Sequence, residues 1–300
     1  MRDLFRKRRM WRRRPELKDR YDVVIVGGGS HGLATAYYLR RRGITDVAVL
    51  EKSYIGSGAA GRNTTILRSN YKTPEGARFY DASVKLYEKL SGELDFNLLF
   101  SQCGHLTLAH GDRAAFVMAD RAEVNRLMGI DSRFISPEEV KRLAPAMVVS
   151  PDATYPIVGA LYHPPGGIIR HDAVVWGFAR GADAGGAELH PYTEVLGFER
   201  TNGRIDAVRT SRGTVKAGVV LNCTAGWSSL ISGMAGVKLP ITTHPLQALV
   251  TEPLKPFLDK VIVSSNLHVY VSQSDRGELV IGAEIDPYTS YSNRSTLYFL

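Results

Sequence analysis

The sequence predicts an α/β fold in which a Rossmann-like βαβ domain contains a β-meander and is joined to a mainly β domain. A β-branched run at residues 23–26 is followed by glycines, a helical segment at 33–42 and a second apolar run at 47–50. Uninterrupted apolar runs of this kind are typical of parallel strands buried on both faces. Three short β runs between residues 194 and 217 indicate the meander, and residues 239–300 have mainly strand composition.

Helix signals continue along the chain. Composition and periodicity predict helices at residues 79–90, 112–128 and 172–184. In the third, apolar residues fall at the i, i+3, i+4 and i+7 positions, which gives the helix one apolar face. Ser136 and Pro137, followed by two glutamates, form a typical helix start, with a capping serine and acids near the positive end.

Strand signals predict the meander in more detail. Asn202 and Gly203, between two β runs, are the strongest short sequence signal of a hairpin. A later apolar run ends at the small-residue turn Thr224-Ala225-Gly226. Strands are expected at residues 104–109, 194–200, 204–210, 214–217, 219–223, 246–250, 268–272 and 279–285.

Most of the excess positive charge lies at the amino terminus. The formal net charge is +8, but residues 1–20 contain ten of the 38 Lys and Arg and three of the 30 acids, so the remaining 280 residues carry only +1. The body of the chain therefore lacks the basic surface of a nucleic-acid-binding domain. Residues 1–20 are expected to be a solvated, disordered leader. Binding of a partner, RNA or an anionic surface is the alternative.

Composition favours a soluble, cytoplasmic protein. Hydrophobic residues make up 44% and charged residues 23% of the chain, as in ordinary globular proteins. No apolar run approaches the ~18 residues that span a bilayer, so no membrane association is expected. Cys103 and Cys223 have neither CxxC nor zinc-site spacing, so no metal is expected, and Cys223 is predicted to be a buried structural thiol.

A GxGxxG pattern separates the first strand from the first helix. Gly27 permits the tight turn, Gly29 lets a pyrophosphate approach the backbone, and Gly32 allows the helix to pack closely on the strands. The pyrophosphate then binds the free N–H groups at the helix amino terminus. Ser30 and His31 lie in this turn, where His31 is expected to donate its backbone amide rather than act as an acid or base.

An acid completes the dinucleotide signature. Glu51 lies at the end of the second strand, nineteen residues beyond Gly32. At this distance its carboxylate can accept hydrogen bonds from the adenosine ribose hydroxyls. The same carboxylate would repel a 2′-phosphate, which argues against NADP. A glycine-rich surface turn is the alternative, but it leaves the acid unexplained.

Later segments select FAD over NAD. The sequence RNTT occupies residues 62–65, and the strand after the meander ends in NCTAG at residues 222–226. With the meander, they resemble the D-amino-acid-oxidase-type family of FAD-dependent proteins. The segments GGGSHGLATAYYL, VAVLEK, GRNTTILRSNY and HPLQALVTEP, with RHD at residues 170–172, are similar more narrowly to the β subunit of heterotetrameric sarcosine oxidase, over residues 21–291.

The resemblance implies further contacts with a non-covalently bound FAD. Asn63 and Thr64 match positions that contact FAD in this family. Val195 matches a strand residue whose backbone meets the adenine. Ala225 and Gly226 match a small-residue turn that passes close to the cofactor.

The resemblance also implies a substrate-binding arginine. In the related single-chain enzymes, the second arginine of a TRxxR segment holds the substrate carboxylate, and Arg68 occupies this position. A guanidinium clamp would orient the N-methyl group of the substrate against the flavin. Thr65 stands at the first arginine position, a departure from that pattern. From the residues alone, a surface ion pair is the alternative for Arg68.

His171 is the candidate for covalent cofactor attachment. From the residues alone, a histidine before the capping Asp172 is most often structural. The resemblance implies instead that His171 carries covalently bound FMN. This FMN would take electrons from FAD and pass them to dioxygen, in a heterotetramer with partner subunits.

The predicted function is FAD-dependent oxidation of sarcosine or a related N-methyl or secondary amino acid. The imine product would hydrolyse to glycine and formaldehyde. One alternative is a related FAD-dependent dehydrogenase acting on dimethylglycine, an opine or a D-amino acid. The other is an inactive, truncated FAD-binding subunit.

The resemblance predicts a discontinuous domain organisation that stops short of the family pattern. Residues 21–95 and 158–232 are expected to form the FAD-binding domain, and 96–157 and 233–300 an incomplete substrate domain. A later strand, a glycine-rich turn and a lysine of the family pattern are absent, so the chain is expected to be truncated at its C-terminus.

Overall fold

The computed structural model describes residues 9–12 and 16–299. Their contacts divide the chain into two compact units. The first comprises Met1–Asn63, Leu94–Asn97 and His171–Thr243, and the second comprises Thr64–Glu93, Leu98–Arg170 and His244–Leu300. These bounds differ from the expected domain boundaries, because residues 64–93 and 158–170 fall into the second unit. Which domain binds cofactor and which binds substrate stays a prediction.

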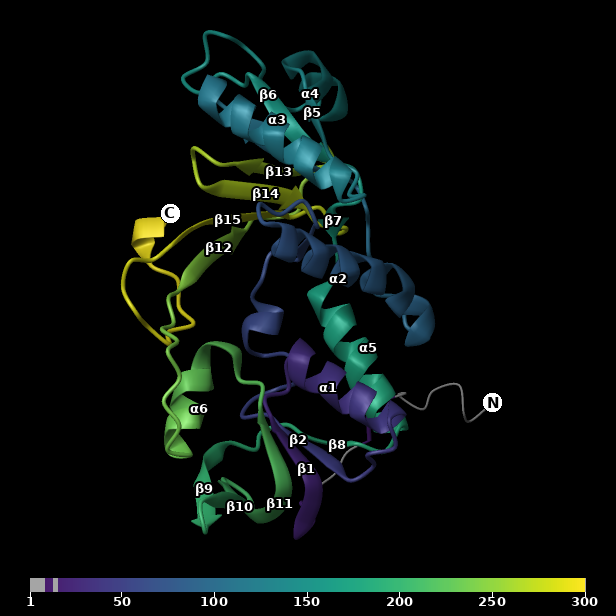
Figure 1. Cartoon of the computed structure of the whole chain (residues 1–300), viewed down its shortest axis with the longest axis vertical. Coiled ribbons are helices and arrows are strands. Elements are labelled where there is room, and N and C mark those ends of the chain that lie inside the picture. The colour runs from purple at the N-terminus through teal and green to yellow at the C-terminus, as the bar shows by residue number, and fades with distance from the viewer. Residues whose placement is uncertain (1–8, 13–15, 300) are drawn as a thin grey trace. The chain divides into compact units, whose positions relative to one another are not determined.

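A six-stranded sheet with helices packed on it forms the first unit. Its strands, in spatial order, are β8 (Glu188–His190), β2 (Val47–Leu50), β1 (Arg20–Val26), β11 (Gly213–Asn222), β10 (Arg204–Thr210) and β9 (Val195–Thr201). Its helices are α1 (Ser30–Arg41), α5 (His171–Ala184) and α6 (Ser228–Met234), with the 3-10 turns η1 (Ala59–Gly61) and η2 (Ala225–Trp227). Strands β8 to β11 are parallel, β10 and β9 are antiparallel, and α1 and α5 lie side by side (Figure 1).

Buried apolar side chains explain why the central strands read as continuous hydrophobic runs. All four residues of β2 are buried, and Val24 of β1 pairs with Ala48 on one side and Val220 on the other. Between the helices, Tyr37 of α1 meets Phe178 of α5 edge-on, with ring centroids 5.8 Å apart. The α/β fold class and the βαβ unit predicted from the sequence are confirmed.

The meander is confirmed, with one correction. Asn202 and Gly203 both have positive φ, at 53° and 81°, as a type I′ hairpin turn requires. The strands expected at 214–217 and 219–223 are instead one strand, β11. Gly218 continues this strand at a close approach to β1, because a Cβ there would lie 2.8 Å from the carbonyl oxygen of Asp22.

Part of the expected leader is ordered. Leu17 packs against the core of the first unit. The ammonium group of Lys18 lies 2.8 Å from a carboxylate oxygen of Asp46 and 3.2 Å from one of Glu188. Residues 16–20 are therefore ordered rather than disordered, with Leu17 and Lys18 in contact with the folded unit. Residues 1–8 and 13–15 lie outside the described residues.

The second unit is built on a seven-stranded mixed sheet flanked by helices. Its strands, in spatial order, are β12 (Leu246–Val250), β15 (Leu279–Ile285), β14 (Val269–Gln273), β13 (Val261–Ser264), β4 (His105–Ala109), β6 (Gly159–His163) and β5 (Arg133–Ile135). A separate pair joins β3 (Ile66–Leu67) and β7 (Gly167–Ile168). The helices are α2 (Pro74–Glu93), α3 (Asp112–Leu127) and α4 (Pro137–Leu143), with the 3-10 turn η3 (Leu297–Phe299).

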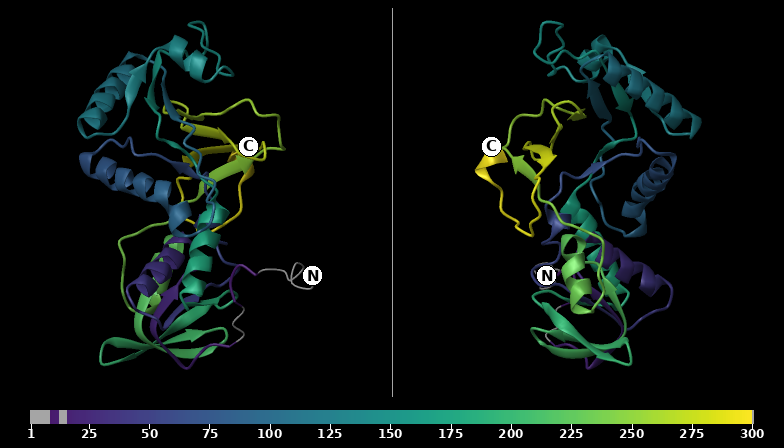
Figure 2. Two further views of the ribbon diagram at one scale, coloured as in Figure 1. Left: turned by 90° about the vertical axis from the view of Figure 1, so that its right-hand side faces the viewer. Right: turned by 60° about the vertical axis from the view of Figure 1, so that its left-hand side comes forward.

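Local capping and packing position the helices of the second unit. Ser136 accepts a hydrogen bond from the backbone N–H of Glu139 at 3.3 Å, so the predicted start of α4 is confirmed. Helix α3 packs against β4, β5 and β6, and its course is clear in both views of Figure 2. Buried Met118 and Ala122 of α3 face Leu161 of β6.

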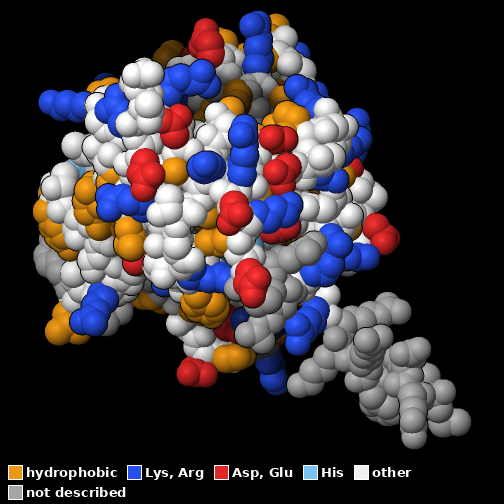
Figure 3. Space-filling model, turned by 90° about the horizontal axis from the view of Figure 1, so that it is seen from below, with side chains coloured by type: hydrophobic (Ala, Val, Ile, Leu, Met, Phe, Trp, Pro, Cys, Tyr) orange, Lys and Arg blue, Asp and Glu red, His pale blue; other side chains and the backbone are white. Residues whose placement is uncertain are grey.

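Charged side chains of both signs share the surface. On the face shown in Figure 3, Lys and Arg side chains are interspersed with Asp and Glu, as the near-neutral charge of residues 21–300 predicts. Within residues 9–12 and 16–299, no helix has both the length and the apolar character that crossing a membrane requires.

Candidate functional site

The turn between β1 and α1 has the geometry that the glycine motif predicts. Gly27 has a φ of 111°, and a Cβ on it would collide with the carbonyl oxygen of Cys223. A Cβ on Gly32 would collide with the carbonyl oxygen of Gly27, so α1 approaches the turn more closely than alanine allows. Cys223 itself is partly exposed rather than buried, which corrects the expectation for this thiol.

Space remains where a pyrophosphate would bind. A Cβ on Gly29 would meet only the Cβ of Ala60, at an ordinary contact distance of 3.7 Å. Helix α1 has no side-chain cap and no acid in its first turn, so its first N–H groups stay available to an anion. Ser30 is partly exposed and His31 is exposed. These features fit a dinucleotide phosphate.

Glu51 holds the turn in place. One of its carboxylate oxygens accepts a hydrogen bond from the backbone N–H of Gly28 at 2.9 Å. The other accepts from the N–H of Ser53 at 2.9 Å and from the hydroxyl of Ser57 at 3.2 Å. A carboxylate has about four acceptor positions, so capacity for one ribose hydroxyl remains. The predicted ribose contact stays a prediction.

The sequence interpretation missed Gly28. A Cβ there would lie 2.8 Å from the Cβ of Glu51 and 2.9 Å from a methyl carbon of Ile55. The middle glycine of the run thus lets the acid pack against the turn, a requirement that the GxGxxG pattern does not contain.

Two further candidate segments flank this turn in the first unit. The Asn63 side chain donates hydrogen bonds to the carbonyl oxygens of Ala59 and Ala60, at 3.2 and 2.7 Å, which closes the η1 turn. Ala225 has a φ of 49°, an uncommon conformation for a residue with a side chain and one that gathers at functional sites. Gly226 accepts a hydrogen bond from the hydroxyl of Thr243 at 2.6 Å.

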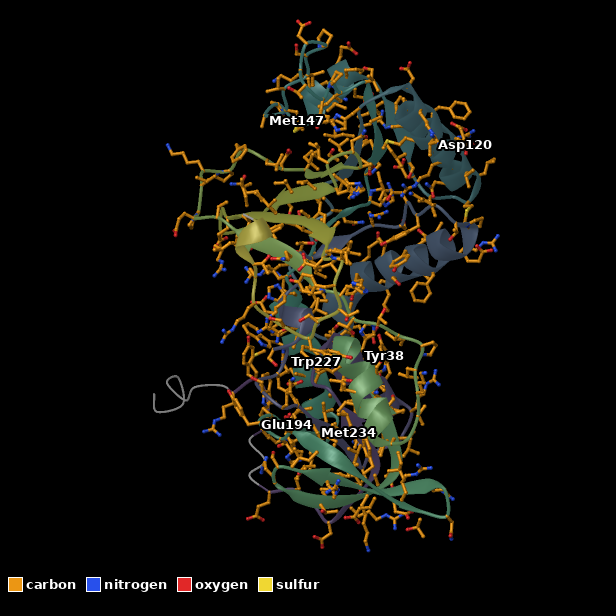
Figure 4. All side chains as sticks on the ribbon, turned by 90° about the vertical axis from the view of Figure 1, so that its left-hand side faces the viewer. Tyr38, Asp120, Met147, Glu194, Trp227 and Met234 are labelled. Carbon is orange, nitrogen blue, oxygen red and sulfur yellow. The ribbon has the colours of Figure 1, made fainter. Side chains whose placement is uncertain are left out.

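Trp227 and Lys52 form a cation–π pair next to that segment. Trp227 lies at the amino end of α6 (Figure 4), and the ammonium group of Lys52 lies 4.2 Å from the centroid of its ring. Both were unmarked in the sequence, because a cation–π pair has no spacing signature.

The remaining cofactor candidates occupy defined elements. Val195 begins β9, with its side chain in the hydrophobic core of the first unit. His171 begins α5 and is partly exposed, while the Asp172 carboxylate accepts a hydrogen bond from the N–H of Ala173 at 2.8 Å. Thr64 belongs to the second unit. Their predicted contacts with FAD and FMN stay predictions.

Arg68 lies in the second unit in an environment rich in positive charge. Its guanidinium lies 4.1 Å from the centroid of the Tyr71 ring and donates a hydrogen bond to the Asn70 side chain at 3.1 Å. Burial lowers the pKa of Arg68, and the nearby phenol groups of Tyr71 and Tyr80 partly oppose this effect. No acid is paired with Arg68 among the described residues. The surface ion pair considered as an alternative is therefore not seen.

Two buried histidines near Arg68 are held neutral. His163 donates from Nδ1 to the carbonyl oxygen of Asp131 at 2.7 Å, and its Nε2 accepts from the N–H of Ser69 at 3.2 Å. Burial lowers the pKa of His163, as does the charge of Arg68. His105, only 1% exposed, has its pKa lowered by burial and then by Arg68. These neutral groups leave the positive charge uncompensated.

Arg121 of α3 is a second cation that the sequence interpretation missed. Burial lowers the pKa of Arg121 to about 10, and the charge of Arg68 contributes to the shift. An arginine in a helical segment is usually interpreted as a solvated surface residue, so no sequence signal could have distinguished Arg121 from Arg126 on the same helix.

The phosphate-binding turn, the acid after the second strand and the inserted meander define the first unit as a dinucleotide-binding fold of the flavoprotein type. The family comparison specifies the cofactor. A family model described as FAD dependent oxidoreductase matches residues 22–297, so the chain belongs to this family. It is an FAD-binding oxidoreductase.

Curated relatives are similar over nearly the whole chain. Sarcosine oxidase subunit beta of an Arthrobacter species is 48% identical, with 95% of this chain and 71% of the relative covered. The same subunit of Rhizobium meliloti is 49% identical, with 95% and 68% covered. Among solved structures, L-proline dehydrogenase from P. horikoshii superposes with a TM-score of 0.85 at 32% identity, with 94% of this chain and 75% of that one covered.

Proposed function

We propose that this chain oxidises sarcosine or a related N-methyl or secondary amino acid, as the β subunit of a larger oxidase. The observation that carries the proposal is the identity of about half of all residues to sarcosine oxidase β subunits over 95% of the chain. The second unit supports it, because its partly buried cations Arg68 and Arg121 suit a ligand with a carboxylate.

In this proposal Arg68 binds the substrate carboxylate. Its guanidinium has free donors, since its hydrogen bonds among the described residues go only to Asn70. Stacking on Tyr71 holds the guanidinium plane, and a fixed fork of donors suits a carboxylate. The surrounding neutral histidines add no negative charge that would compete.

The chemistry divides between cofactor and protein. Bound FAD supplies a two-electron acceptor for cleavage of a C–H bond next to the substrate nitrogen. The protein orients that bond through the carboxylate, and orientation of this kind supplies a large share of catalytic energy. The imine that leaves takes up water and breaks down to the amine and an aldehyde, which for sarcosine are glycine and formaldehyde.

The proposal includes a second flavin and partner chains. FMN joined covalently to His171 would re-oxidise FAD and pass electrons to dioxygen. His171 is partly exposed at the start of α5, next to Asp172, whose carboxylate accepts a hydrogen bond from the N–H of Ala173. The relatives are named as subunits, which supports a hetero-oligomer, and a cytoplasmic location is part of the same proposal.

A dehydrogenase acting on a cyclic secondary amino acid is a second candidate. The 32% identity to L-proline dehydrogenase favours it, because proline and sarcosine share an α-carboxylate and a secondary amine. Anaerobic reduction of the bound FAD by each amino acid in turn separates the two. Faster reduction by proline than by sarcosine would favour the dehydrogenase.

Substitution of Arg68 tests the carboxylate clamp. In the flavin-loaded assembly, Arg68→Gln should lower the second-order rate constant for reduction of FAD by sarcosine by about a hundredfold. This is the expected effect of losing one charge-assisted pair. Stopped-flow absorbance of FAD under anaerobic conditions measures this. Arg133→Gln, at an exposed arginine paired with Glu139, should react like the parent.

Two results would contradict the proposal. No bleaching of FAD by sarcosine in a fully loaded parent assembly would exclude the substrate. Equal reduction rates in the Arg68→Gln variant and the parent would exclude the clamp but leave the reaction class standing.

A further inference from the structure

A cavity of about 480 Å³ in the second unit has three cations and one acid in its lining. It is bounded by the segment after β3, the start of α3 and the turn between β13 and β14. Lys72, Arg113 and Arg121 contribute three cations, and Ser265 and Asn266 contribute polar atoms from the third segment. Asp120, exposed on α3, helps to locate this helix in Figure 4.

The cations of the cavity have no counter-ion in the described part of the chain. Asp112 is the single acid of the lining, so two positive charges remain in excess. Lys72, Arg113 and Arg121 make no ion pair there, whereas Arg126, further along α3, lies 2.6 Å from the carboxylate of Glu123. The lining thus differs from an ordinary charged surface, where opposite charges alternate.

Arg121 gives the strongest indication of a ligand. Its Nε is fully buried and has no hydrogen-bond partner among residues 9–12 and 16–299. A buried donor without a partner costs about 1–3 kcal/mol, more when it is charged. The pKa of Arg121, lowered to about 10, reflects the same burial. An anion in the cavity would compensate the charge of Arg121, which burial disfavours.

Helix α3 adds a second source of positive potential. Gly111 precedes the helix without a side-chain cap and lines the same cavity. A sixteen-residue helix carries roughly half a positive charge at its amino end. The helix end and the three cations act on one space, with Asp112 in the first turn of α3 as the single opposing charge.

We propose that the cavity lined by Lys72, Arg113 and Arg121 is an anion-binding site that takes a small doubly charged oxyanion, a dicarboxylate or a phosphate. This site is additional to the FAD-binding turn, lies in the other unit, and goes beyond the proposed amine oxidation. Two excess charges match a dianion, while a monocarboxylate would leave one charge unpaired. A volume of 480 Å³ admits a ligand of several heavy atoms.

Calorimetric titration of the FAD-saturated protein with inorganic phosphate tests the site. Saturation with FAD blocks the phosphate-binding turn, so any further phosphate must bind elsewhere. The parent should show saturable binding that weakens as chloride rises. Malonate should bind as phosphate does, and acetate at least tenfold more weakly. Tighter binding of malonate than of phosphate would identify the occupant as a dicarboxylate, and the reverse order as a phosphate.

Matched variants locate the bound anion. Arg121→Met should weaken phosphate binding by about tenfold, the value of one charge-assisted contact. Arg126→Met, on the same helix, should bind phosphate like the parent. Lys72→Met and Arg113→Gln alter exposed side chains that the fold does not depend on, so they test the site even if Arg121→Met is unstable.

Three outcomes would overturn the assignment. The first is the absence of saturable phosphate and malonate binding by the parent. The second is unchanged binding in Lys72→Met and Arg113→Gln. The third is loss of binding in Arg68→Gln without loss in the cavity variants, which would place the anion at Arg68.

Discussion

At the scale of single residues, the second unit contains several buried polar groups without partners. Among the described residues, Arg121 Nε, Asn70 Nδ2, both ring nitrogens of His105 and both polar atoms of Asn125 lack hydrogen bonds. Native proteins satisfy nearly all such groups. Most of these groups lie in the second unit, which also contains Arg68, although Arg40 Nε of the first unit lacks a partner as well.

The buried histidines make stability depend on pH. His105 and His163 have lowered pKa values in the folded state, chiefly through burial. Above the unfolded pKa of about 6.5 both states are neutral and the histidines have no effect. Below it the unfolded state binds more protons, so the free energy of unfolding falls as the pH falls.

Replacing His105 should weaken this dependence. His105→Leu removes one neutral buried group and two unpaired nitrogens, so unfolding free energy at pH 7.5 should be kept or raised by about 1 kcal/mol. Between pH 6.5 and 5 the decline should become shallower than in the parent. Urea unfolding at several pH values measures both. His268→Asn, at an exposed histidine, should leave the slope unchanged; an unchanged slope in His105→Leu would contradict the assignment.

Residues of the site differ in how visible they were in the sequence. The glycines and Glu51 stand at fixed spacings because backbone geometry demands them. Arg68 and His171 carried no such signal and were selected only through a family resemblance. Arg121 could not be predicted at all, since its role depends on which face of α3 meets the sheet.

At the scale of elements, the glycines of the β1–α1 turn serve two different needs, one for folding and one for cofactor binding. Gly32 is required by packing, because a Cβ would collide with the carbonyl oxygen of Gly27. Gly29 has no such constraint, because its nearest neighbour is 3.7 Å away. Its lack of a side chain is explained by a ligand rather than by the fold.

Two alanine variants should therefore behave differently. Gly29→Ala should keep the thermal stability of the apoprotein but weaken FAD binding at least tenfold, because the methyl group occupies the path of the pyrophosphate. Gly32→Ala should lower both the stability of the apoprotein and its affinity for FAD, with a destabilisation of about 1–3 kcal/mol from overpacking. Thermal unfolding of the apoprotein and fluorescence titration with FAD measure the two effects.

A glycine in another helix provides the control. A Cβ on Gly92 of α2 would meet nothing within 4 Å, so Gly92→Ala should raise stability by about 0.5–1 kcal/mol and leave FAD affinity unchanged. If Gly29→Ala bound FAD as tightly as Gly92→Ala, the pyrophosphate would not lie over Gly29.

The predicted boundaries of helices and strands agree with the structure where a local cap or turn sets them. Helix α2 begins earlier than expected, at Pro74, because the Thr73 hydroxyl accepts a hydrogen bond from the N–H of Gly76 at 3.2 Å. That cap was readable but overlooked. Strand β13 was also overlooked, although Val261-Ile262-Val263 is a β-branched run that predicts a strand; it pairs with β14 and with the distant β4.

At the scale of the whole molecule, the sequence predicted the family but not the division of the chain. Residues 64–170 separate the first and last segments of the first unit, and of these only Leu94–Asn97 belong to that unit. No change in composition marks the points where the chain passes from one unit to the other. The chain passes between units directly after Asn63 and again at Arg170. The predicted FAD contact at Thr64 and flavin attachment at His171 thus both adjoin a crossing point.

The predicted attachment of FMN concerns the whole molecule, because it is tested in the assembled enzyme. In protein co-expressed with its partner subunits, acid precipitation should leave flavin on the parent chain, while FAD is released. His171→Gln should retain no flavin, because the amide cannot replace the imidazole nitrogen in a bond to the flavin methyl group. Absorbance and mass of the precipitated chain measure this.

A second histidine makes that result specific. His31→Gln alters an exposed side chain in a turn whose predicted contribution is its backbone amide, so the chain should keep its covalent flavin and its FAD. Equal covalent flavin in the His171→Gln variant and the parent would move the attachment elsewhere. Flavin-free parent protein would remove FMN from the proposal, yet FAD reduction by sarcosine could still occur, because that step depends on Arg68 and the first flavin alone.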